Sequence, residues 1–166
     1  MLNLIFLYIL GKYIYKNKEM SYRLESITDR DHKDWKKYQK ICFDTKNDMD
    51  PGPNMIHFKY VNQKTGQTVG YCSVRLNHNL DYLSEYGLSS YDPSMKVNSL
   101  WNVCSTKKEK GVCVKMIKSV LTTYCFIPMT LAVYKTNEPA IKCYQTVGFS
   151  HINNKNKNSN AYFMIY

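Results

Sequence analysis

A short basic loop with one glycine is the first stretch whose residue types could do chemistry. It spans residues 105–111, follows an apolar strand pattern at 100–104, and contains three lysines before Gly111. Apolar residues then recur at helix-face spacing from Val112 to about Tyr124. A loop that opens a helix leaves backbone N–H groups unpaired at the positive end of the helix dipole, and glycine lets the backbone approach a ligand. The stretch is suited to a phosphate or pyrophosphate, although many strand-to-helix turns combine one Gly with Lys for solubility alone.

A second stretch with fixed spacing follows the next strand pattern, at 129–134. It reads Asn137-x-x-Ala140-x-x-Cys143-Tyr144-x-x-x-Gly148-Phe149 and has the apolar spacing of a helix. The unit as a whole is therefore strand, basic loop, helix, strand, helix.

These two stretches resemble the two central motifs of the GNAT superfamily of acetyl-CoA-dependent N-acetyltransferases. The family writes the first as Arg/Gln-x-x-Gly-x-Gly/Ala, matched here by Lys108-x-x-Gly111-x-Cys113. It writes the second as Asn-x-x-Ala-x-x-Phe-Tyr-x-x-x-Gly-Phe, which is more specific because several residue types must agree at fixed spacing. The match covers about a third of the chain, and chance explains it poorly.

The resemblance implies a binding site for acetyl-CoA, the acetyl donor. Strand residues before the loop would meet the pantetheine and the thioester carbonyl, and loop N–H groups would hold the pyrophosphate. Asn137 would contact the pantetheine arm. The implied cofactor-binding residues are Trp101, Asn102, Val103, Lys108, Glu109, Lys110, Gly111, Val112, Cys113, Val114, Asn137 and Tyr144.

The loop departs from the family pattern in two ways. Lys108 is a point charge in place of a bidentate fork, which still suits a phosphate. Cys113 puts a larger side chain where the family has Gly or Ala, and Glu109 adds a negative charge. Because the contacts come mainly from the backbone, we expect these changes to lower affinity at most.

Tyr144 matches the family tyrosine that hydrogen-bonds the CoA sulfur and can protonate the leaving thiolate. It is our one predicted catalytic residue, against the alternative of an amphipathic core tyrosine in a Tyr-rich chain. Gly148 and Phe149 are architectural in this interpretation.

The sequence does not identify the general base that an ammonium acceptor requires. Ribosomal-type members carry a Glu five residues before the motif Asn, where this chain has Ala132; histone-type members carry one where it has Val97 and Asn98. A water chain remains possible, as do three residues of the long connection at 77–97, although such residues are more often just solvated: Glu85, His78 and Asp81.

The favoured function is therefore an N-acetyltransferase in which a primary amine, of a small molecule or a protein, attacks acetyl-CoA directly in a ternary complex. No metal and no covalent intermediate are expected, since Cys104 and Cys113 have no evident His partner. The alternative is a non-catalytic acyl-CoA-binding or interaction module of the same fold. The net charge of +10 favours anionic partners. The lysines of the chain are scattered, however, and do not form one basic face, so a nucleic-acid partner is not expected.

The expected fold is an α+β sandwich: a mixed, mostly antiparallel central sheet, splayed at the CoA site and flanked by helices on both faces. Strand patterns at 22–27, 55–61, 68–76, 100–104, 129–134, 150–152 and 161–166 alternate with helical patterns beginning near Asp31, Val112 and Pro139. The loops at 48–54 and 77–97 would decide which acceptor is used, and the oligomeric state stays open.

Residues 20–166 form the expected acetyltransferase domain, preceded by an apolar extension at 1–19. Its apolar run from Leu2 to Leu10 is shorter than the ~20 residues of a spanning helix and lacks signal-peptide features. It could still reach a membrane through residues 2–15, or lie upstream of a functional start at Met20. Six cysteines without zinc-ligand spacing, mostly inside apolar patterns, are interpreted as buried thiols of a reducing compartment, which predicts a cytoplasmic protein.

Overall fold

A computed structural model describes residues 21–27, 32–43, 54–79, 92, 94–106, 109–124, 126–152 and 159–166. Within 32–43, it describes the side chains of Lys33, Lys36, Lys37, Tyr38, Lys40 and Cys42. The predictions for the N-terminal extension, for most of the loop at 48–54, for Glu85 and Asp81, and for Lys108 lie outside these residues.

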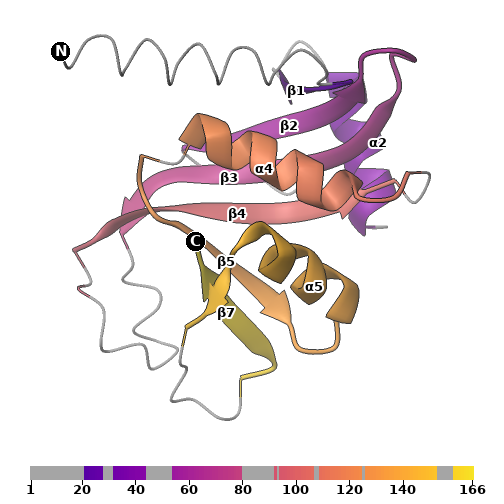
Figure 1. Ribbon diagram of the computed structural model, residues 1–166. Coiled ribbons are helices and arrows are strands. Elements are labelled where there is room, and N and C mark those ends of the chain that lie inside the picture. Colours follow the sequence, from indigo (N-terminus) through magenta and orange to yellow (C-terminus); the bar gives the residue numbers. More distant parts are fainter. Residues whose placement is uncertain are drawn as a thin grey trace, which may run out of the picture.

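The described residues form seven strands of one sheet and three helices (Figure 1). In chain order they are β1 (Tyr22–Ile27), α2 (His32–Phe43), β2 (Met55–Asn62), β3 (Thr68–Asn79), β4 (Lys96–Ser105), α4 (Val112–Tyr124), β5 (Met129–Tyr134), α5 (Glu138–Val147), β6 (Ser150–His151) and β7 (Ala161–Ile165). This confirms the predicted α+β class and nearly all of the predicted elements.

The sheet has the strand order β1-β2-β3-β4-β5-β7-β6. Every neighbouring pair is antiparallel except β4 and β5, which run parallel. The parallel pair is joined by α4, since parallel neighbours need a crossover connection. It is also the shorter of the two ladders that β4 forms, with only Asn98↔Met129 and Ser99↔Thr130 in register.

The two faces of the sheet are covered by different helices, with α4 in front of β2, β3 and β4 and α2 behind them (Figure 1). The α4 face carries the main core, in which Phe58 of β2 packs near Tyr124 of α4 with ring centroids 5.8 Å apart. On the opposite face, Tyr38 of α2 packs against Tyr71 of β3 at 5.0 Å. Because successive side chains of a strand point to opposite faces, each strand supplies both cores.

Helix α4 buries one stripe of its surface, as the apolar spacing predicted. The buried side chains are Val112, Met116, Ile117, Val120 and Leu121. Each such side chain contributes roughly 1.5–3 kcal/mol by its burial, so packing holds this helix and fixes where its first turn lies.

The prediction of six buried thiols is wrong for four cysteines. Cys42 is joined to Cys104 and Cys113 to Cys143, with Cα atoms 5.5 Å and 6.4 Å apart. These separations suit disulfides, but the partners are 62 and 30 residues apart in sequence, so cysteine spacing gave no signal. Cys72 is a free, buried thiol, as predicted. A cytoplasmic location stays a prediction and loses its argument from thiols.

The predicted connection at 77–97 is shorter than expected, because β3 extends to Asn79 and β4 begins at Lys96. His78 is therefore a strand residue, only 9% exposed, and not a solvated loop histidine.

No helix among the described residues is both long and apolar enough to cross a membrane. The same part of the chain contains no group of three or more His, Cys, Asp or Glu side chains that could hold a metal ion.

Candidate functional site

Strand β4 contains a bulge at the residues predicted to meet the thioester. Tyr71 of β3 pairs with Cys104, and two residues later Ser73 pairs with Trp101, so β4 carries one extra residue between these pairs. Asn102 takes up the irregularity with a left-handed φ of 53°. Bulges re-aim backbone groups and side chains, and they are common beside active sites.

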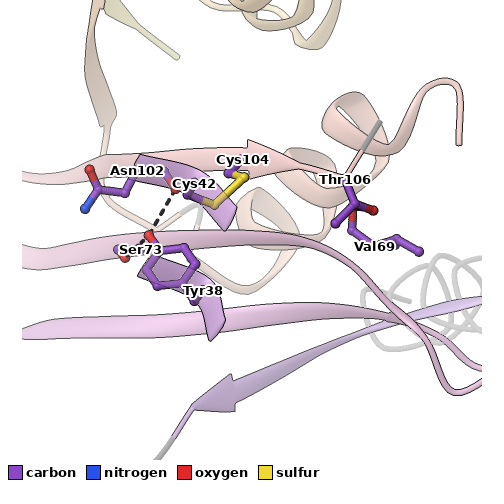
Figure 2. Close-up of a disulfide and its surroundings, with 7 residues drawn as sticks. All are labelled: Tyr38, Cys42, Val69, Ser73, Asn102, Cys104 and Thr106. Atoms are coloured by element: carbon purple, nitrogen blue, oxygen red, sulfur yellow. Dashed lines mark hydrogen bonds between the residues drawn. A yellow bond between two sulfur atoms is a disulfide. The ribbon is translucent and has the colours of Figure 1, made fainter. Parts of the chain in front are cut away.

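Helix α2 holds this bulge from the face opposite α4, and Figure 2 shows its Tyr38 and Cys42 beside Asn102 and Cys104. The hydroxyl of Tyr38 donates to the backbone carbonyl of Asn102 at 3.1 Å and lies 3.2 Å from Ser73 Oγ. One turn later on the same helix, Cys42 is joined to Cys104, two residues past Asn102. The bulge is thus anchored by a hydrogen bond and by a covalent bond.

A buried histidine completes this anchor. His57 Nδ1 lies 2.6 Å from Ser73 Oγ. Because Tyr38 donates its one proton to Asn102, the consistent pattern is His57 to Ser73, Ser73 to Tyr38 and Tyr38 to Asn102, each group donating to the next. Burial lowers the pKa of His57 to about 4 and raises that of Tyr38 well above its usual range. Ser73 is fully buried, so this Ser–His pair is a scaffold and not a nucleophile.

Strands β4 and β5 separate just before the bulge. Their last paired rung is Ser99↔Thr130, and from there on β5 pairs only with β7 while β4 pairs only with β3. The sheet is therefore splayed at the position that the resemblance implied. Trp101, 40% exposed, lies on β4 just past this rung.

The first turn of α4 follows the end of β4 and carries free backbone donors. Gly111 precedes the helix with φ 76°, and no atom lies within 4 Å of where its Cβ would stand. Lys115 N–H donates to Gly111 O at 3.1 Å, whereas no described residue accepts from the N–H groups of Val112, Cys113 or Val114. An anion fits such donors at the positive end of a helix dipole.

The negative charge of Glu109, next to this turn, is compensated by two hydrogen bonds. Its carboxylate accepts a hydrogen bond from the Tyr22 hydroxyl and another from Asn62 Nδ2 at 3.2 Å. These bonds, the Tyr22 bond above all, hold the pKa of Glu109 below its usual range. The side chain ties the loop to β1 and β2, which is a structural reason for an acid in a phosphate-type loop.

The two predicted motifs meet at a disulfide. Cys113 stands where the family has Gly or Ala, and Cys143 stands where it has Phe. The structure joins these two cysteines, so both departures are one feature that connects the first turn of α4 to α5.

Tyr144 follows Cys143 on α5 and is buried, with only 7% of its surface exposed. Its ring packs edge-on against Phe149 with centroids 6.0 Å apart. Burial, followed by the nearby thiol of Cys72, raises the pKa of Tyr144 to about 12. The hydroxyl therefore stays protonated at any working pH, which suits a hydrogen-bond donor to a sulfur better than a strong acid.

The other predicted residues have mixed placements. Asn137 is the N-cap of α5, its side chain accepting from Ala140 N–H at 3.3 Å, so its amide already has a structural role. Val103 packs on the main core, and Lys110 is exposed at the turn. Ala132 is exposed on β5, whereas Asn98 is buried and bonds Tyr124 O and Asn77 N–H, as a scaffold residue would.

The residues that sequence reasoning missed are those whose partners are distant in sequence. The hydrogen bonds from His57 to Ser73 and from Tyr38 to Asn102 span 16 and 64 residues. Tyr38 lies within the helical pattern that begins near Asp31, which does not mark it as a functional residue, and no local pattern marks Ser73 or His57.

Comparisons with known proteins find relatives in structure only. No family model matches the chain, and no curated protein matches its sequence. Among solved structures, NAA60 from Arabidopsis thaliana in complex with acetyl-CoA superimposes with a TM-score of 0.64, covering 87% of this chain and 97% of that one at 14% identity. The aminoglycoside acetyltransferase AAC(6')-Ib in complex with coenzyme A gives 0.61, covering 88% and 94% at 13% identity.

Spermidine N-acetyltransferase from Vibrio cholerae, in complex with CoA and spermine, gives a TM-score of 0.60, covering 89% of this chain and 96% of that one at 10% identity. At these identities the likeness concerns the fold. With its splayed sheet, its bulged β4 and its two motifs, the chain has the fold of the GNAT acetyltransferases.

Proposed function

We propose that this protein transfers the acetyl group of acetyl-CoA to a primary amine, by direct attack of the amine in a ternary complex. The observation that carries the proposal is that three features follow one another from the start of α4 back along β4: the free N–H groups of α4, the bulge at Asn102 and the opening between β4 and β5. The pyrophosphate, the thioester and the acetyl group of one acetyl-CoA molecule require such features in that order.

In this proposal the N–H groups of residues 112–114 hold the pyrophosphate, with Lys108 and Lys110 adding positive charge. Backbone groups of Trp101, Asn102 and Val103 bind the pantetheine and the thioester carbonyl oxygen. Donors placed where negative charge develops are often the largest single contribution to such a rate. The anchors from α2 keep these donors in place before the substrate binds.

The reaction itself balances without any group on the enzyme being modified. The amine nitrogen forms a bond to the thioester carbon, the carbon–sulfur bond breaks, and CoA leaves as a thiolate. Tyr144 stabilises or protonates that sulfur. The amine nitrogen loses one proton to a general base. Ala132 and Asn98, which stand where family members carry a Glu, cannot act as that base.

The acceptor is an amine of a small molecule or a protein. The structural neighbours include enzymes described with kanamycin, with spermine and with a bisubstrate analogue, so the fold accommodates amines of very different size. Which amine this chain accepts depends on loops outside the described residues.

A pair of glycine substitutions tests the cofactor site. Gly111 and Gly66 both have left-handed φ values, 76° and 67°, and at neither does any atom lie within 4 Å of where a Cβ would stand. Ala at either site costs about 1–2 kcal/mol of backbone strain. We expect Gly111→Ala to weaken acetyl-CoA binding at least tenfold in calorimetric titration, because its methyl group enters the pyrophosphate position. Gly66→Ala, in the β2–β3 hairpin, should bind as the wild type does; equal affinities in all three proteins would contradict the site.

A further inference from the structure

A second polar chain crosses the sheet at the last rung of the opening between β4 and β5. His78 Nε2 lies 2.7 Å from Ser99 Oγ, and Ser99 Oγ lies 2.7 Å from Thr130 Oγ1. The three residues belong to β3, β4 and β5 in turn. They are 9%, 2% and 1% exposed.

We infer that His78, Ser99 and Thr130 form a proton relay that removes the proton from the attacking amine. The inference rests on the proposed function and supplies the base that the sequence did not reveal. It is carried by the position of the chain at the apex of the opening, and by the hydrogen bonds at its two ends.

The hydrogen bonds of the chain are satisfied in two states. His78 Nδ1 lies 3.0 Å from the carbonyl of Asn79, which can only accept, so this nitrogen carries a proton. With neutral His78, Nε2 accepts from Ser99 and Ser99 accepts from Thr130. With protonated His78, Nε2 donates to Ser99, Ser99 donates to Thr130, and Thr130 donates to the carbonyl of Asn98 at 3.2 Å. Each protonation state of the imidazole therefore has a complete set of partners.

The step conserves protons. As the amine nitrogen bonds to the thioester carbon, its proton passes to Thr130 Oγ1. The Thr130 proton passes to Ser99 Oγ, and the Ser99 proton passes to His78 Nε2. The resulting imidazolium later releases one proton to solvent, and the chain returns to its neutral state.

The relay lies at the closed end of the opening, where Ser99 and Thr130 form the last rung between β4 and β5. Trp101 stands two residues past Ser99 on the same face of β4, and Ala132 stands two residues past Thr130 on the same face of β5. Both are exposed. An amine between them would have Thr130 below it. An exposed indole also suits a cationic acceptor through cation–π attraction.

Among the residues that the structure describes, few charged groups lie on the strands of the relay. Arg75 pairs with Ser99 in register and so shares its face, whereas Lys96 pairs with Asn79 on the other face. β5 and β7 carry no charged residue. The described lysines of α2 (Lys33, Lys36, Lys37 and Lys40) are exposed, and its Tyr38 and Cys42 are bound at the bulge. No residue of β3, β4, β5 or β7 is acidic, so His78 is the base that this part of the sheet offers.

The test is the pH profile of kcat/KM in variants at both ends of the relay. The wild type should lose rate on the acid side through the ionisation of one group, as a histidine base requires. His78→Gln can still accept from Ser99 but does not titrate. It should remove this limb and lower kcat/KM at neutral pH about 10²-fold, the usual scale of base catalysis, with acetyl-CoA affinity unchanged.

Thr130→Val keeps the shape of the side chain without the hydroxyl and should lose activity similarly, whereas Thr130→Ser should restore it. An unchanged limb and rate in His78→Gln, in a protein that still binds acetyl-CoA, would overturn the relay and leave the proposed function standing. A wild type that binds acetyl-CoA but acetylates no amine would overturn both.

Discussion

The hydroxyl of Tyr38 donates a 3.1 Å hydrogen bond to the backbone carbonyl of Asn102, the one left-handed residue of β4. The two residues are 64 positions apart in sequence. Through this bond, a helix on one face of the sheet fixes the direction of the backbone groups that would hold the thioester. Binding geometry at the bulge therefore depends on packing behind it.

Tyr38→Phe should lower kcat/KM for acetyl transfer about tenfold, because the bulge loses its anchor while its shape is kept. The free energy of unfolding should fall by about 1–2 kcal/mol for the lost buried hydrogen bonds. Steady-state kinetics and urea unfolding measure the two effects. Tyr134→Phe, at a tyrosine 70% exposed on β5, is the matched control and should change neither. A loss of stability with unchanged kcat/KM would show that the anchor serves the fold alone.

Reduction of the Cys113–Cys143 disulfide should destabilise the protein and weaken acetyl-CoA binding together, since this bond connects the first turn of α4 to the helix that carries Tyr144. A crosslink over 30 residues contributes up to about 3–4 kcal/mol in the chain-entropy account. Unfolding and titration with and without reductant measure both changes.

The double variant Cys113→Ala with Cys143→Ala is the control for this prediction. It should begin at the lower stability and affinity of the reduced site. Reductant should then lower its affinity less than it lowers that of the wild type, because only the Cys42–Cys104 bond is left to break. If reductant lowered acetyl-CoA affinity equally in the variant and the wild type, the Cys113–Cys143 bond would not be the cause.

Tyr144→Phe should lower kcat about 10²-fold, with a smaller effect on acetyl-CoA affinity, because the hydroxyl acts on sulfur that gains charge only as the bond breaks. Burial raises the pKa of Tyr144 to about 12, so the wild-type rate should show no alkaline loss from this group below about pH 10. Tyr162→Phe, at an exposed tyrosine of β7, should keep full activity. Full activity in Tyr144→Phe would show that this tyrosine is a core residue and not the acid.

His57 should make stability fall on the acid side. Burial lowers its pKa from 6.5 to about 4. Between these two pH values His57 is therefore mostly protonated in the unfolded chain and mostly neutral in the folded chain. The contribution of His57 to the free energy of unfolding should be constant above pH 6.5 and should fall by up to about 3 kcal/mol between pH 6.5 and 4. Urea unfolding at several pH values measures this. The fall should be smaller in His57→Gln and unchanged in His151→Gln, which replaces an exposed histidine; equal curves for all three proteins would contradict the assignment.

Much of the fold and part of the site could be predicted from the sequence, because the signals are local. Short windows of sequence contain the apolar spacing of α4, the alternation in β2 and β3, and the strand–loop–helix order around Gly111. The fixed spacing from Asn137 to Phe149 likewise marked α5 and the position of Tyr144. These features agree with the structure.

The parts that could not be predicted depend on contacts between distant residues. From sequence alone, Cys113 is expected to lower cofactor affinity, because nothing local indicates its bond to Cys143. His78 is expected in a loop, because Asn77 and Asn79 weaken the strand pattern. The relay needs three strands to meet, and no single window of sequence contains more than one of its members. Sequence spacing therefore indicated the proposed cofactor site but not the groups that would surround the acceptor.

The most direct test of the account is acetyl transfer by the purified full chain to a panel of amines that includes a polyamine, an aminoglycoside and a peptide with a free N-terminus. Mass spectrometry measures acetylated product and a coupled assay measures CoA. We predict that at least one amine is acetylated with one CoA released per acetamide formed, and that Tyr144→Phe slows this turnover. Tight binding of acetyl-CoA without transfer to any amine would contradict the account and would indicate an acyl-CoA-binding module with the same fold.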